Sequence, residues 1–182
     1  MAIIMILTAC SRPPAEDMNK AIDAVTMAEN DADAVSYAGN TLIRARDALV
    51  RMQSEADAKR YDAAKNFAAE AVSLAEKAIA DGKTGAARAR EEAANLISGL
   101  AGPLSETANA LDVAEQNGIP VQDLDALKDD MDSARRSYSD AQQSLANNNY
   151  PDSIAKSQNV RSLLSHVNGR LTEAAQAVSR KQ

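Results

Sequence analysis

The sequence predicts an all-α protein, either an elongated antiparallel helical bundle or a short helical-repeat array, with about six helices in two three-helix copies. Three observations lead to this prediction. Hydrophobic residues make up 45% of the 182 residues, whereas Gly and Pro number only 7 and 5. Apolar residues recur every three or four positions, which places them on one helical face. The same apolar pattern then occurs twice along the chain.

The first copy predicts three helices. Pro13-Pro14, with acidic residues just after it, is typical of a helix start. Residues 30–33 interrupt the apolar pattern, and a second helix is expected over 42–56. A third helix is expected to begin at residue 61 and to reach about residue 100 if two glycines, at 82 and 85, do not break it. Gly102-Pro103 indicates the next stop and restart.

The second copy repeats this phase. Residues 104–114 follow the first helix at an offset of 86, and the pattern resumes at an offset of 89 after a loop at 117–120. Apolar residues at three- and four-residue spacing predict helices over 124–145 and from Pro151 to about residue 178. We therefore expect a first helical unit over 15–101 and a second over 102–182.

The N-terminus has a pattern of its own. Residues 2–7 form an apolar run that is too short to span a bilayer. Leu7, Thr8 and Ala9 precede Cys10, the only cysteine, and this tetrapeptide resembles the lipobox of bacterial lipoproteins. No Lys or Arg precedes the apolar run, and a start upstream of Met1 would account for that. The other interpretation is a chance apolar N-terminus with a free or buried cysteine.

The resemblance implies a particular processing and location. Residues 1–9 would be a signal peptide removed before Cys10, whose sulfur would carry lipid and anchor the protein to a membrane. Residues 10–14 would form a short tether, so the helical domain would lie close to that membrane. Ser11 after the anchor favours the outer membrane over the inner one, on the periplasmic side, in bacteria that follow this sorting rule.

A second resemblance concerns the helical region. The spaced alanines and the segment Tyr61-Asp62-Ala63-Ala64 resemble an uncharacterised class of bacterial envelope lipoproteins with tetratricopeptide-like helical hairpins. The similarity covers roughly residues 18–80. The second copy departs from it, because Tyr150 is followed by Ser153 where the pattern has alanine. This resemblance implies a location and a fold but no chemistry.

Charge and residue types limit the functions to consider. The net charge of −6, with no basic stripe, argues against nucleic-acid binding. His166 is the only histidine, so zinc ligation and histidine-based catalysis lack ligands or partners, and we interpret it as a surface residue. Asp125, Asp129 and Asp132 share a helical face and are weak candidates for a cation site, although a solvated helix start explains them better. We therefore expect no metal, no cofactor and no enzymatic activity.

The remaining hypotheses concern binding. Tyr61 and Tyr150 begin equivalent helices and either line a ligand groove or close a corner between helices. Helical repeats commonly present grooves to partner proteins, so we expect a scaffolding or protein-interaction module with an envelope protein as partner. The alternative is a small apolar or lipidic ligand held between helices, which requires an internal cavity. The apolar stripes also fit self-association of the chain into a homo-oligomer.

Overall fold

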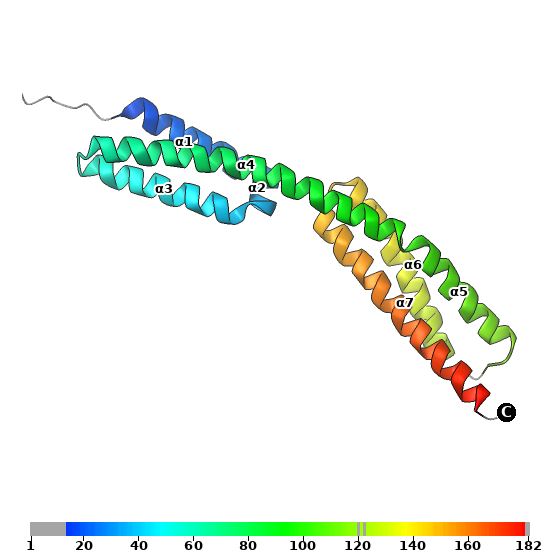
Figure 1. Ribbon diagram of the computed structural model, residues 1–182. Helices are drawn as coiled ribbons and strands as arrows, with labels where there is room; N and C mark the ends of the chain where they lie inside the picture. Colours follow the sequence, from blue (N-terminus) through cyan, green and yellow to red (C-terminus); the bar gives the residue numbers. More distant parts are fainter. Residues whose placement is uncertain (1–13, 120, 122, 181–182) are drawn as a thin grey trace, which may run out of the picture. The chain divides into compact units, whose positions relative to one another are not determined.

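The computed structural model describes residues 14–119, 121 and 123–180, which fold into helices joined by short turns (Figure 1). No strand occurs in this part of the chain, so the predicted all-α fold is confirmed. Six helices match the six expected ones, and one short helix, α2, is additional. The helices are α1 (Ala15–Asn30), α2 (Ala32–Tyr37), α3 (Gly39–Asp57), α4 (Tyr61–Ser98), α5 (Ala101–Gln116), α6 (Leu124–Ala146) and α7 (Tyr150–Ser179).

Helix α2 is the element that the periodicity does not reveal. The Asp31 side chain accepts a hydrogen bond of 2.8 Å from the backbone amide of Ala34 and so caps the new helix. The interruption at residues 30–33 is therefore a boundary between two consecutive helices. With only six residues, α2 is too short to show a helical period.

Helix α4 is continuous through both of its glycines. It ends at Ser98, and a turn at Gly99-Leu100 precedes α5. Gly102 and Pro103 lie in the first turn of α5, so the predicted stop at these two residues is wrong by a few positions. Proline is tolerated there because an amide in the first turn of a helix has no intrahelical partner in any case.

The chain forms two compact units, which divide inside α4. Unit 1 reaches to Ala86, and unit 2 begins at Ala87. The boundary expected from the sequence, after residue 101, lies close to the turn between α4 and α5. The two units are described separately below.

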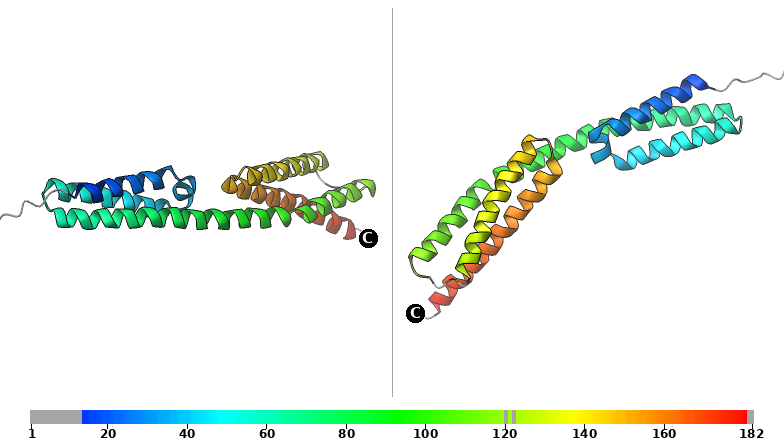
Figure 2. Two further views of the ribbon diagram at one scale, coloured as in Figure 1. Left: turned by 90° about the horizontal axis from the view of Figure 1, so that it is seen from above. Right: turned by 180° about the vertical axis from the view of Figure 1, so that it is seen from behind.

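In unit 1, α1 and α3 lie beside the first part of α4 (Figures 1 and 2). The core of this unit consists mainly of alanine, with a few larger side chains such as Val25, Leu42 and Met52. Small side chains let helices approach closely, because the distance between helix axes depends on the residues at the contact. The buried alanines of this core are Ala21, Ala28, Ala34, Ala38, Ala45, Ala48, Ala68, Ala71, Ala75 and Ala78.

Two glycines in α4 provide the closest approach in unit 1. A Cβ atom on Gly82 would lie 2.5 Å from the backbone nitrogen of Ala34, and one on Gly85 would lie 2.5 Å from the Cβ of Tyr37. Both distances are shorter than any normal contact. In the sequence alone, these glycines only weaken the helical pattern. In the structure, α2 packs against α4 at these two glycines.

In unit 2, α6 and α7 pack against each other over most of their length, and α5 has fewer contacts with either (Figure 2). The core of this unit has larger side chains than that of unit 1. Its members are Leu100, Leu111, Leu127, Met131, Ala134, Val160, Leu164 and Val167.

Repeated positions are buried in both units, which supports the proposed duplication. Leu42 and Ala45 of α3 correspond, 89 positions later, to Met131 and Ala134 of α6, and all four are buried. Buried positions of α1 also correspond to buried positions of α5, at an offset of 86. Buried positions of α4 correspond to buried positions of α7, at an offset of 89. The further buried pairs are Ala21 and Thr107, Val25 and Leu111, Ala28 and Ala114, Ala64 and Ser153, Ala68 and Ser157, Ala71 and Val160, Ala75 and Leu164, and Ala78 and Val167.

Candidate functional site

The N-terminal residues singled out in the sequence, Leu7, Thr8, Ala9 and Cys10, lie outside the described residues. Their assignment as cleavage motif and lipidation site stays a prediction. Within the part of the chain that the structure describes, no helix is both long enough and apolar enough to cross a membrane.

The two tyrosines begin the helices that follow each corner. Tyr61 is the first residue of α4 and Tyr150 the first of α7, and both are partly buried. The Tyr150 hydroxyl donates a hydrogen bond of 2.9 Å to the side-chain oxygen of Asn148 in the preceding turn. This contact lies within the turn itself, and the two roles expected of the tyrosines, lining a groove or closing a corner, stay predictions.

His166 has an acidic neighbour that is distant in sequence. Its Nδ1 lies 3.0 Å from a carboxylate oxygen of Asp130, which links α7 to α6, and the ring is largely exposed. Asp125, Asp129 and Asp132 of α6 are also exposed. Among the described residues, no three His, Cys, Asp or Glu side chains form a group that could hold a metal ion.

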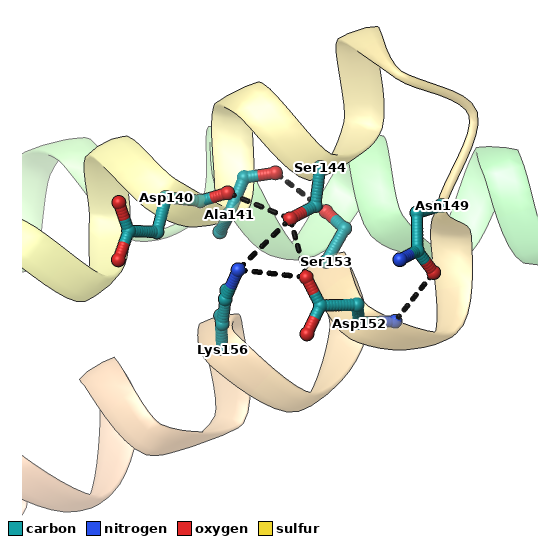
Figure 3. Close-up of polar contacts among 7 residues, drawn as sticks. All are labelled: Asp140, Ala141, Ser144, Asn149, Asp152, Ser153 and Lys156. Atoms are coloured by element: carbon teal, nitrogen blue, oxygen red, sulfur yellow. Dashed lines mark hydrogen bonds and ion pairs between the residues drawn. The ribbon is translucent and has the colours of Figure 1, made fainter.

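The densest polar cluster lies at the corner between α6 and α7 (Figure 3). The buried Ser144 hydroxyl lies 2.8 Å from the carbonyl oxygen of Asp140 and 2.5 Å from a carboxylate oxygen of Asp152. Lys156 donates to Ser144 at 3.1 Å and forms an ion pair with Asp152 at 2.7 Å. Ser153, which directly follows Asp152 in α7, donates to the carbonyl of Ala141 at 2.9 Å. The cluster therefore joins the end of α6 to the start of α7.

The electrostatics of this cluster favour a role in holding α6 against α7. The hydrogen bond from Lys156, and then that from Ser144, hold the pKa of the Asp152 carboxyl below its ordinary value. A serine beside a lysine can form a catalytic dyad only if the amine is free to accept a proton. Here the amine of Lys156 is engaged by a carboxylate, and the hydroxyl of Ser144 is buried. The arrangement supports helix packing and not nucleophilic catalysis.

The equivalent corner of unit 1 uses different residues. Arg60 forms two hydrogen bonds with the carboxylate of Glu55, one of them 2.9 Å long, and this lowers the pKa of Glu55. The guanidinium of Arg51 lies 5.9 Å from the centre of the Phe67 ring. Arg51, Glu55 and Phe67 occupy the positions of Asp140, Ser144 and Lys156 in the second copy.

Unit 1 has an exposed apolar face, which we define as Ile22, Val35, Ile43 and Val50. These side chains are 44 to 70% exposed. Ile43 and Val50 are seven residues apart on one face of α3, and Arg46 between them forms an ion pair of 2.6 Å with Glu29 of α1. Ile22 lies two turns before Glu29 on the same face of α1. Val35 and Ile43 also line one surface hollow of about 500 Å³.

Unit 2 has a groove of about 280 Å³ between α5 and α6, which we call the α5–α6 groove. Each helix contributes four residues at positions i, i+3, i+4 and i+7, which form one helical face. The apolar members are Ala108, Leu111 and Met131, and the charged members are Asp112, Glu115, Lys128, Asp132 and Arg135.

The family comparison applies mainly to unit 1. Residues 16–94 match the family model of a domain of unknown function, DUF4398. No curated protein and no solved structure matches the chain. The matched segment runs from α1 to near the end of α4 and includes the apolar face. The family description states no activity.

Sequence reasoning missed the polar corner of unit 2 and the α5–α6 groove. The spacing of Asp152 and Lys156, four residues apart at a helix start, was one usable signal for the corner. The contact with Ser144 depends on how the turn at 147–149 brings two helices together, and periodicity alone does not specify that. The groove similarly depends on the separation of α5 from α6.

Proposed function

We propose that the protein is a non-enzymatic lipoprotein of the bacterial cell envelope, held at a membrane by lipid on Cys10 and acting as a protein-interaction or scaffolding module. Because Ser11 follows the anchor, the outer membrane, facing the periplasm, is the preferred location. The helical units would sit close to the membrane on their short tether.

The observation that carries the interaction role is the apolar face of unit 1. Its core is made largely of alanine, yet larger apolar side chains such as Ile43 and Val50 are left on the surface. Exposed apolar side chains that gather on a small domain, as Val35 and Ile43 do around one hollow, are typical of surfaces that contact another protein. The face also lies within the segment that matches the family model.

The same observations favour a protein partner over a small apolar ligand. An apolar ligand needs an enclosed pocket lined mainly by hydrophobic side chains. The hollows of about 250 to 500 Å³ found among the described residues each have at least one charged side chain in their lining. A surface of this kind suits a protein contact better than it suits a lipidic molecule.

The anchor is tested by comparing the native protein with Cys10→Ser. The native form should gain acyl mass, begin at Cys10 and partition with membranes, and the variant should do none of these. A native form that stays unmodified would overturn the lipoprotein assignment.

The interaction role is tested by photo-cross-linking in intact cells. A photoreactive amino acid at position 50, on the apolar face, should give a discrete cross-linked product with another envelope protein. The control is position 113 of unit 2, because Val113 on α5 is also exposed, at 52% against 70% for Val50, and no other large apolar side chain of unit 2 is equally exposed among the described residues. Equal products from both positions, or none from position 50, would contradict the interaction role of this face.

A further inference from the structure

The charges around the α5–α6 groove do not balance. Lys128 of α6 reaches across to Glu115 of α5 at 2.6 Å, and Arg135 pairs with Asp132 of its own helix at 3.1 Å. Asp112 has no ion pair or hydrogen bond within the described residues, and neither does Asp125 at the start of α6. Asp112 in the groove and Asp125, one turn before Lys128, therefore have no cation within ion-pair distance.

These carboxylates are close enough to act on the groove. The pKa of Lys128 is raised, chiefly by its hydrogen bond to Glu115 and further by the charges of Asp125 and Asp112. One ammonium group thus lies in the field of three carboxylates. The surplus negative charge is a feature of the groove and not only of the chain as a whole.

The groove also has the residue pattern of a surface that accepts an extended or helical segment. Ala108, Leu111 and Met131 line the groove, and of these Ala108 is partly exposed whereas Leu111 and Met131 are buried. A helical segment that lies between two helices places an apolar side chain on such a floor, and its flanking charges meet the rim.

We propose that the α5–α6 groove binds a basic segment of a partner protein, with Lys or Arg side chains opposite Asp112 and Asp125 and an apolar side chain over Ala108. The proposal rests on the interaction role proposed above, and it names the kind of partner that unit 2 accepts. A bare metal ion is a poorer occupant, because no three carboxylates here converge on one point. Partner charges of this sign would also increase the rate of association with an acidic chain.

The probe for a direct test is a labelled helical peptide of about 18 residues with leucine on one face and lysine on the other. Its binding to the full chain is measured by fluorescence anisotropy at about 0.15 M salt. The double variant Asp112→Asn, Asp125→Asn should bind about fivefold more weakly than the native chain. The matched control is Asp23→Asn, Glu76→Gln, which removes two exposed acidic charges from unit 1 and should change the affinity by less than about twofold.

Each outcome of the peptide test decides something. If both double variants weaken binding equally, the peptide responds to net charge alone and the groove assignment is wrong. If a peptide with glutamate in place of lysine binds as tightly, the proposed chemistry is wrong. Protection of Ala108 and Leu111 amides from hydrogen exchange by the lysine peptide, and not in the groove variant, would support the assignment.

The cellular experiment separates this proposal from the proposed function. A photoreactive amino acid at position 108 should cross-link to a partner through the groove, and the Asp112→Asn, Asp125→Asn background should abolish that product. If position 50 gives a product but position 108 gives none, the interaction role stands and the groove proposal fails. If position 108 alone gives a product, the groove proposal stands and the apolar face of unit 1 is not the contact surface.

Discussion

The two units place side chains of different size at equivalent buried positions. In α4 the repeated core positions are alanine, whereas in α7 they are two serines followed by Val160, Leu164 and Val167. The helical phase is the same, and the positions are buried in both. A repeat can thus keep its pattern of burial while the volume of its core changes.

The smaller side chains of unit 1 also allow an additional helix to pack on α4. Unit 1 uses mainly small residues along α4, and two of them, Gly82 and Gly85, let the additional helix α2 approach the backbone of α4. In unit 2 the corresponding region contains Gly118, and its described residues, 117–119, 121 and 123, form no helix before α6. The same pattern of buried helix positions can therefore be filled in two ways, by small residues with closely spaced helices or by larger side chains.

Leu164 gives the strongest test of this contrast. Leu164→Ala should lower the free energy of unfolding by about 2–5 kcal/mol, because it removes a buried side chain and leaves a cavity. The measurement is urea denaturation followed by circular dichroism. The matched change in unit 1 is Ala75→Leu, which inserts the same side chain at the equivalent buried position and should cost about 1–3 kcal/mol through overpacking. If Ala75→Leu is neutral, unit 1 has spare volume and the contrast between the cores is wrong.

The glycines of α4 provide the next largest effect. Gly82→Ala should destabilise unit 1 by about 1–3 kcal/mol, because the new Cβ would meet the backbone of Ala34 and would push α2 away. Hydrogen exchange of α2 amides should increase in this variant. Gly169→Ala in α7 is the control, since its Cβ would meet nothing within 4 Å, and it should stabilise the protein by about 0.5–1 kcal/mol through helix propensity. Effects of the same sign would contradict the close-approach explanation.

Part of this comparison could be predicted from the sequence. Three- and four-residue spacing of alanine and leucine predicts the six long helices and their buried faces, because that signal is local. The offset between the copies also survives in the buried positions. The short α2 could not be predicted in this way, because its stability depends on a cap at Asp31 and on contact with two distant glycines.

The candidate sites were less predictable than the fold. His166 shows the reason: its partner, Asp130, is 36 residues away, and only the packing of α6 against α7 brings them together. The free charges of Asp112 and Asp125 become significant only because Lys128 and Glu115 satisfy each other across a groove. Such relations depend on which helix faces meet, and a single sequence does not specify this.

Two buried serines of α7 occupy positions that are alanine in α4, and we expect them to affect stability by smaller amounts. Ser153 donates a hydrogen bond to Ala141 of α6, whereas the buried hydroxyl of Ser157 has no hydrogen-bond partner within the described residues. Their counterparts in unit 1 are Ala64 and Ala68. Ser153→Ala should therefore destabilise the protein by about 1 kcal/mol, and Ser157→Ala should stabilise it by about 1 kcal/mol. Urea denaturation of both variants measures the difference, and equal changes would show that neither hydroxyl contributes through its hydrogen bonding.

Each corner should respond to acid through one carboxyl whose pKa is lowered, and this is the smallest effect expected. The pKa of Asp152 is lowered in the folded state by Lys156 and Ser144, and an unfolded aspartate titrates near about 3.9. A carboxyl with a lowered pKa contributes stability above its unfolded value and loses that contribution as the pH falls through its folded value. Asp152→Asn should therefore reduce the urea midpoint at neutral pH, and the difference from the native protein should shrink below about pH 4. Glu55→Gln should show the same trend in unit 1, because Arg60 lowers the pKa of Glu55. A difference that persists unchanged in acid would mean that Asp152 acts through its shape and hydrogen bonds and not through its charge.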